Sequence, residues 1–176
     1  VFNSQLNAIT DSQEEYSLSY PNDGWVEADP ADILKTVQNT VSDVLKKENA
    51  ITACGITNQR ESTVVWSRET DEPIYPAIIW QDRRTHEFCK KLKDSGHEKM
   101  VREKTGLVID PYFSATKIKW ILDNVTGARE LANDDKLMFG TIDSYLIYKL
   151  TKEKKHYTDV TNASRTMLFN INEMKW

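Results

Sequence analysis

The residues best suited to chemistry follow an apolar, strand-like run over residues 51–57. This run leads into four polar side chains, Asn58, Gln59, Arg60 and Glu61. Arginine presents a rigid fork of donors and glutamate presents acceptors, so Arg60 and Glu61 can together hold adjacent hydroxyl groups of a small ligand. In open α/β sheets, ligands bind just beyond the carboxyl ends of the strands. The alternative interpretation is a surface ion pair between Arg60 and Glu61, which contributes little free energy.

Two aromatic residues are further candidates for a ligand site. Trp80 ends a second apolar strand, and a flat aromatic face suits the C–H side of a polyol. Tyr112 precedes a predicted helix, where a hydroxyl on a loop can contact a ligand. Each also has a structural interpretation, Trp80 as core or rim packing and Tyr112 as one of two buried rings in a turn. Asp143 falls at the start of a predicted helix and is interpreted as structural.

The elements that must position these residues alternate between strand-like and helix-like patterns, which indicates an α/β fold. Asp29 is predicted to cap a helix with Pro30 at its first position and an apolar face that continues to Leu45. The other expected helices are 81–92, 97–104, 116–124, 127–133 and 141–150, and the expected strands are 1–2, 6–20, 51–57, 62–67 and 74–79. The tail from 157 to 170 is expected to be irregular.

Composition disfavours several classes of partner. The chain has 176 residues, enough for one domain or a large part of one, and a net charge of −4 with both signs scattered along it. That balance argues against nucleic acid or an anionic membrane surface, and no apolar run approaches the ~20 residues that span a bilayer. Cys54, in an expected buried strand, and Cys89, in an expected helix, set no disulfide framework and favour a reducing cytoplasm. No glycine-rich phosphate loop, zinc-ligand spacing or nucleophile elbow is present.

Several longer stretches closely resemble the glycerol kinases of the FGGY carbohydrate kinase family. The resemblance runs in order from Gly24 to Trp176. Residues 112–124 are also similar to a recurring signature of the wider family. The stretches that carry the resemblance are 55–61, 77–84, 104–124, 139–146 and 159–170.

The resemblance implies an actin-like, ribonuclease-H-like α/β fold with two domains around a deep cleft. Residues 1–176 are then expected to be an incomplete N-terminal domain, without the first strand and its phosphate loop. The implied activity is ATP-dependent phosphorylation of glycerol to sn-glycerol 3-phosphate in the cytoplasm, by a homodimer or homotetramer. ATP and Mg²⁺ are expected to bind mainly to segments outside these residues, as is the aspartate that acts as general base. The chain alone is therefore expected to be inactive.

The resemblance also implies roles for individual residues. Arg60 and Glu61 are expected to grip two hydroxyl groups, Trp80 to form an apolar wall, and Tyr112 to add a further hydroxyl contact. The Arg-Glu pair favours glycerol over a pentulose, because xylulose kinases carry a His-Gly pair at this place. Two alternatives remain open: a kinase for another small polyol or sugar, and a non-catalytic polyol-binding domain of kinase descent.

Overall fold

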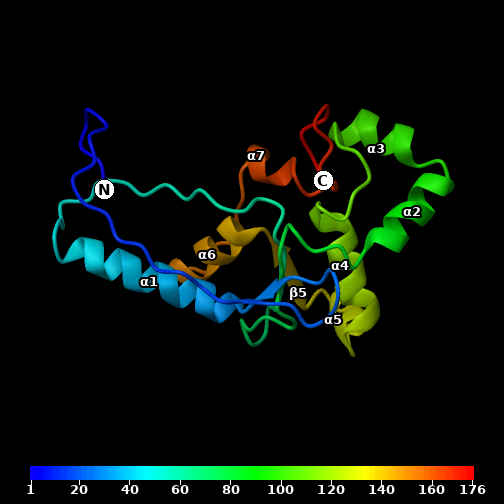
Figure 1. Cartoon of the computed structure of the whole chain (residues 1–176), viewed down its shortest axis with the longest axis horizontal. Helices are drawn as coiled ribbons and strands as arrows, with labels where there is room; N and C mark the ends of the chain where they lie inside the picture. Colours follow the sequence, from blue (N-terminus) through cyan, green and yellow to red (C-terminus); the bar gives the residue numbers. More distant parts are fainter.

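The computed structural model describes residues 1–176 and shows helices gathered around short strands (Figure 1). The first helix, α1, runs Pro30–Leu45 as the sequence predicts. Asp29 accepts a hydrogen bond of 2.8 Å from the backbone N–H of Ala31 and so caps the helix. Ile33 is among the α1 side chains that are buried, so this helix packs one face on the core.

Five short strands form two small sheets that are joined by one residue pair. In the first sheet β1 (Leu18–Ser19), β2 (Glu27–Ala28) and β4 (Ala77–Ile78) lie antiparallel in that order. In the second sheet β3 (Val64–Ser67) pairs antiparallel with β5 (Leu137–Gly140). Thr63 and Ile78 exchange two backbone hydrogen bonds of 3.0 Å, which connects the two sheets. The sequence patterns did not predict β5.

The remaining helices lie where the sequence predicts them, with shifted ends. Helix α2 begins five residues later than expected because Asp82, instead of entering a helix, accepts the backbone N–H groups of Val26 and Arg84. A short helix also forms in the tail that was expected to be irregular. The observed bounds are α2 His86–Asp94, α3 Glu98–Thr105, α4 Ser114–Asn124, α5 Ala128–Asn133, α6 Ile142–Leu150 and α7 Val160–Ala163.

Helices cover both faces of the β3–β5 sheet, and this produces the α/β layering. Trp66 of β3 is fully buried against Tyr145 of α6, with ring centroids 5.6 Å apart. Successive side chains of a strand point to opposite faces, so Val65 packs on the other side, with Ile121 of α4. None of the helices combines the length and the apolar character that crossing a bilayer requires.

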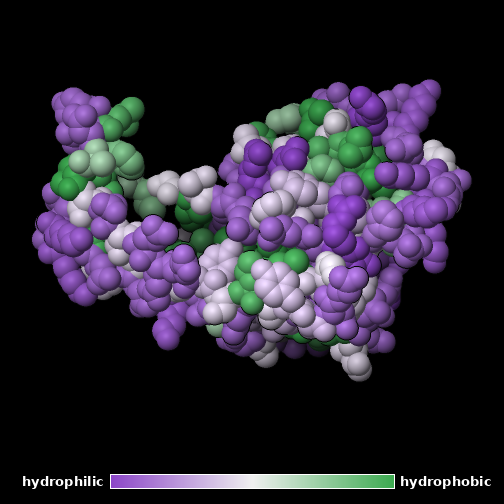
Figure 2. All heavy atoms as spheres, in the orientation of Figure 1, coloured by the Kyte–Doolittle hydropathy of each residue, from purple (hydrophilic) through white to green (hydrophobic).

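The prediction of a strand at 51–57 is wrong, and the predicted strand at 6–20 forms only at Leu18–Ser19. Residues 51–57 are extended and exposed and make no backbone hydrogen bond, and Cys54 is exposed rather than buried. Over 6–20 only β1 is paired in a sheet. An alternating apolar pattern suits a strand, but a strand forms only where a neighbouring backbone satisfies its N–H and C=O groups. Here the segment faces a hollow beside α1 instead of another strand (Figures 1 and 2).

Candidate functional site

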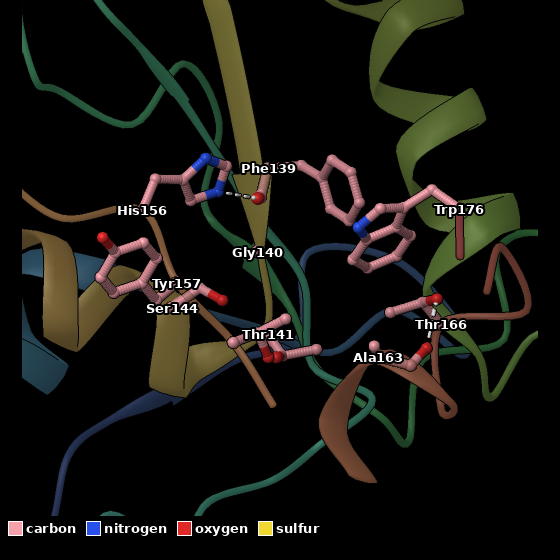
Figure 3. A pocket seen from close by; sticks show the side chains of 10 residues that line it. Phe139, Gly140, Thr141, Ser144, His156, Tyr157, Ala163, Thr166 and Trp176 are labelled. Atoms are coloured by element: carbon pink, nitrogen blue, oxygen red, sulfur yellow. Dashed lines mark hydrogen bonds between the residues drawn. The ribbon is translucent and has the colours of Figure 1, made fainter. Parts of the chain in front are cut away.

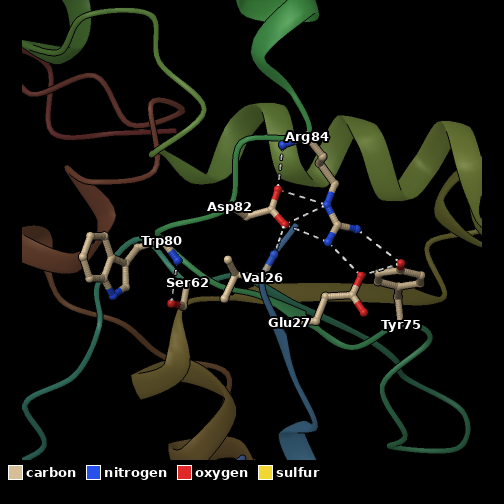
Figure 4. Close-up of polar contacts among 7 residues, drawn as sticks. All are labelled: Val26, Glu27, Ser62, Tyr75, Trp80, Asp82 and Arg84. Carbon is tan, nitrogen blue, oxygen red and sulfur yellow. Dashed lines mark hydrogen bonds and ion pairs between the residues drawn. The ribbon is translucent and has the colours of Figure 1, made fainter. Parts of the chain in front are cut away.

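Three of the four residues selected from the sequence meet at one edge of the joined sheets. Glu61 lies just before β3, and Trp80 lies just after β4. Because Thr63 pairs with Ile78 in an antiparallel register, Glu61 and Trp80 lie at the same end of this pairing. The backbone N–H of Trp80 donates to Ser62 Oγ at 3.2 Å, which fixes this edge (Figure 4).

Tyr112 reaches the same edge from the loop before α4. Its ring meets the Trp80 ring edge to face, with centroids 5.7 Å apart, and packs on Phe113 at 5.3 Å. The loop is held because the Tyr112 N–H donates to Asp110 Oδ1 at 2.9 Å. Trp80 and Tyr112 are both half-buried, so each has a packed side and an open side. Because the ring planes are 62° apart, the two residues form an angled apolar surface, and each ring can face the C–H groups of a ligand.

Lys117 of α4 connects the segments that carry Glu61 and Tyr112. Its side chain is fully buried, and its Nζ donates to the backbone carbonyls of Glu61 at 3.1 Å and of Tyr112 at 2.5 Å. Burial lowers the pKa of Lys117 to about 7, opposed by the negative charges of Asp82, Glu61 and Asp110. The lysine therefore serves as an internal brace between the two loops, a role that sequence reasoning missed.

Glu61 forms an ion pair with a residue that the sequence analysis did not select. Its carboxylate is buried, and Oε1 accepts a hydrogen bond of 2.7 Å from Nε of Arg165. Arg165 lies in the stretch 159–170, which was used for the resemblance without a role being given to the arginine. The sequence feature that could have indicated Arg165 is its place between two small polar residues, Ser164 and Thr166. The interpretation of Arg60 and Glu61 as a surface ion pair is therefore wrong.

Arg60 is the one selected residue that packs against none of the others. It lies in an exposed turn and makes no hydrogen bond or ion pair. The turn is closed because the backbone N–H of Ser62 donates to the Gln59 carbonyl at 3.1 Å. Its guanidinium therefore has no partner within the protein, one residue before Glu61.

A buried ionic network supports the strand that ends in Trp80 (Figure 4). The Arg84 side chain is fully buried and pairs with Asp82 at 2.8 Å and with Glu27 at 2.7 Å. Its guanidinium also stacks 3.9 Å from the Trp25 ring centroid and 4.6 Å from that of Trp120. Burial alone would lower the pKa of Arg84, but the hydrogen bonds with Asp82 and Glu27 raise it. The network fixes the backbone at residues 82–84, shortly after Trp80.

Asp143 has the contacts of a structural residue. It is buried at the start of α6 and accepts hydrogen bonds from Asn58 Nδ2 at 3.1 Å, from Thr158 Oγ1 at 2.8 Å and from Thr141. It thereby ties the extended segment 51–57 to α6 through Asn58. These three hydrogen bonds join three segments of the chain, which agrees with the structural interpretation.

Several cavities lie away from the selected residues. One, of about 410 Å³, lies beside α6 and α7, where His156 Nε2 is 2.8 Å from the Phe139 carbonyl oxygen (Figure 3). Another, of about 860 Å³, lies between the end of α1 and residues 50–55. No three His, Cys, Asp or Glu side chains gather closely enough to hold a metal ion, so these residues do not fit Mg²⁺.

Comparisons with known proteins identify the family and the fold of the chain. All of residues 1–176 match the N-terminal domain of the FGGY family of carbohydrate kinases. The chain is 53% identical to a glycerol kinase of Aliivibrio salmonicida and 56% identical to one of Burkholderia pseudomallei, each over 180 residues. Both alignments cover 100% of this chain but 36% of the relative, so the chain spans about a third of their length.

Solved structures give the same result. The crystal structure of Plasmodium falciparum glycerol kinase with ADP superposes with a TM-score of 0.94 at 34% identity, over 99% of this chain and 36% of that one. A ligand-bound xylulose kinase from Lactobacillus acidophilus has a TM-score of 0.82 at 23% identity, over 99% of this chain and 34% of that one, and shares the fold. The actin-like, ribonuclease-H-like α/β fold expected from the sequence is thereby confirmed.

Proposed function

Because the chain belongs to the FGGY family of carbohydrate kinases, we propose that it is the glycerol-binding part of a glycerol kinase. The full-length protein transfers the γ-phosphoryl group of ATP to glycerol and yields sn-glycerol 3-phosphate. One observation carries the proposal: Glu61, Trp80 and Tyr112 come from three separate segments and converge at one edge of the sheets. The relatives with more than half of their aligned residues identical are glycerol kinases, which supports glycerol as the acceptor.

Each residue contributes a different contact to a bound polyol. The Arg60 guanidinium donates to a hydroxyl oxygen, and the Glu61 carboxylate accepts a hydroxyl hydrogen. Trp80 packs against the C–H face, and the Tyr112 hydroxyl adds a polar contact at the rim. Phosphoryl transfer depends mostly on alignment of the acceptor and on neutralisation of developing charge. Holding two neighbouring hydroxyls leaves one primary hydroxyl to face the phosphate.

The phosphate-binding and proton-accepting groups belong to other parts of the full-length protein in this proposal. Residues 1–176 form an incomplete N-terminal domain that is inactive alone, and ATP and Mg²⁺ bind mainly elsewhere. Residues 51–57 make no backbone hydrogen bond and lie beside an apolar hollow. This supports the proposal that a further strand, from outside these residues, pairs with them. The free thiols of Cys54 and Cys89 fit a reducing cytoplasm, and the active form is a homodimer or homotetramer.

A coupled ADP-release assay on a full-length protein containing these residues tests the proposal. Glycerol, other small polyols and pentuloses are supplied in turn at a range of concentrations, with ATP and Mg²⁺. The highest kcat/KM is expected for glycerol. A preference for a pentulose or another polyol would identify the alternative kinase, and polyol binding by calorimetry without ADP release would identify the non-catalytic alternative.

A further inference from the structure

The two carboxylate oxygens of Glu61 have different surroundings. Oε1 accepts the Arg165 Nε–H at 2.7 Å, whereas Oε2 accepts no hydrogen bond from the protein. Oε2 keeps some solvent-accessible surface, although the Glu61 side chain as a whole is only 7% exposed. The protein therefore holds one oxygen and leaves the other without a hydrogen bond.

Arg165 is itself held in place on two sides. Its guanidinium carbon lies 5.0 Å from the Phe113 ring centroid, which is a cation–π contact next to Tyr112. Its backbone N–H donates to the Asn162 carbonyl at 3.0 Å, at the end of α7. The following residue, Thr166, accepts the backbone N–H of Ala115 at 2.8 Å, which ties this segment to the start of α4. The arginine is thus oriented before any ligand arrives.

The cap of α7 adds to this rigidity. Asp159 accepts hydrogen bonds from the side chain and backbone of Thr161 and from Asn162, which lower its pKa to about 2. Such a cap fixes the first turn of a helix that is only four residues long. Arg165 follows this turn by two residues, so its direction is set by a well-closed local structure.

Arg165 is the cation that pairs with the Glu61 carboxylate in the structure. Lys117 donates to the backbone carbonyl of Glu61, not to its side chain, and Arg60 makes no contact with it. A buried carboxylate without a partner is unfavourable, and a charged hydrogen bond with fixed geometry both compensates it and orients it. The side chain of Arg165 keeps 29% of its exposure against 7% for Glu61, so the arginine lies on the solvent side of the pair.

We propose that Arg165 is a positioning residue that holds Glu61 by Oε1 and so presents Oε2 to a hydroxyl of the acceptor. The inference rests on the proposed function, in which Glu61 binds glycerol. Because Arg165 also stacks on Phe113, it connects the Glu61 carboxylate to the loop that carries Tyr112. Glu61 Oε2 and the rings of Trp80 and Tyr112 therefore keep a fixed separation.

The test compares Arg165→Met, Arg165→Lys and the control Arg102→Met in a full-length protein containing these residues. Arg102 is exposed on α3 and forms no ion pair. Loss of a hydrogen bond to a charged group changes affinity by about ten- to a hundredfold, and Arg165→Met is expected to raise the glycerol KM by that factor. The ATP KM is expected to stay the same. Arg165→Lys keeps the charge without the planar fork and is expected to give an intermediate glycerol KM.

A double-mutant cycle with Glu61→Gln separates positioning from a general structural role. If Arg165 acts through Glu61, the effects of Arg165→Met and Glu61→Gln on glycerol kcat/KM are strongly non-additive. Additive effects, or an unchanged glycerol KM with a lower melting temperature, would overturn the inference while the proposed function stands. A wild-type protein that does not phosphorylate glycerol would overturn the proposed function, and the inference with it.

Discussion

The Nζ atom of Lys117 donates a 3.1 Å hydrogen bond to the backbone carbonyl of Glu61, although the lysine side chain has no exposed surface. The same ammonium donates to the carbonyl of Tyr112 at 2.5 Å. The buried Lys117 side chain therefore holds the backbone of two residues, Glu61 and Tyr112, that are proposed to contact glycerol. Buried cations are costly unless they are well hydrogen-bonded, which indicates that this brace has a specific use.

Lys117→Met is expected to destabilise the protein and to weaken glycerol binding together. The change removes the hydrogen bonds from Lys117 to the carbonyls of Glu61 and Tyr112, and the Glu61 carbonyl keeps only a longer bond of 3.4 Å from Thr63 Oγ1. Loss of a donor to a buried carbonyl costs about 1–3 kcal/mol. Urea unfolding and the glycerol KM of a full-length protein measure the two effects. The matched control is Lys119→Met on the same helix, whose side chain is 42% exposed and pairs with Asp123. Equal costs for both variants would contradict the proposed brace.

The stability contributed at Lys117 is expected to depend on pH. Its pKa is lowered by burial from 10.5 to about 7 in the folded protein, so between these values the unfolded state binds more protons. The free energy of unfolding contributed by this group therefore rises with pH across that window. The difference in unfolding free energy between wild type and Lys117→Met, measured at pH 7 and pH 9, is expected to grow. A difference that stays constant would show that the lysine keeps an ordinary pKa.

Arg60→Ala is expected to impair catalysis without affecting stability. Arg60 has no partner in the protein, so its loss leaves no buried group unsatisfied. We expect the glycerol KM to rise by about tenfold or more, as for loss of a charged hydrogen bond, and kcat to fall. Steady-state kinetics and thermal unfolding are compared with Arg68→Ala, a control whose side chain is 48% exposed. Unchanged glycerol kinetics in Arg60→Ala would contradict the assignment of this residue.

Arg84→Met is expected to be the most destabilising of these changes. It leaves Asp82 and Glu27 buried without their cation, a loss of about 3–5 kcal/mol for a broken buried pair. The neighbouring Arg83→Met is the control, because Arg83 is 49% exposed and pairs with Asp110 at the surface. That change is expected to cost less than about 1 kcal/mol. Urea denaturation of both variants decides the matter, and similar midpoints would contradict the role of the network.

Local signals predicted much of the helical structure from the sequence. Asp29 and Pro30 mark the start of α1 within a few residues, so no distant contact was needed to find it. The strand predicted at 51–57 was wrong because pairing depends on what lies alongside, which the pattern of one segment does not contain. Strand β5 was missed for the related reason that only its pairing with β3 defines it.

The candidate site was predicted in part, for reasons of the same kind. Arg60, Glu61, Trp80 and Tyr112 were selected by residue type and by family resemblance, and the geometry brings the last three together. That Glu61 and Trp80 lie at the same end of the sheets follows from the pairing of Thr63 with Ile78, which sequence spacing does not specify. Arg165 was missed because its contact with Glu61 joins positions 104 residues apart.

That long separation has a consequence for how the site assembles during folding. The hydrogen bond between Ser62 and Trp80 closes a loop of 18 residues, whereas the one between Glu61 and Arg165 closes a loop of 104. The entropic cost of closing a loop grows with its length. We therefore expect the contact between Ser62 and Trp80 to form first and the contact between Glu61 and Arg165 to form last. The Glu61 carboxylate then stays hydrated until late in folding. The chain can select a ligand only after Arg165 has formed its hydrogen bond with Glu61.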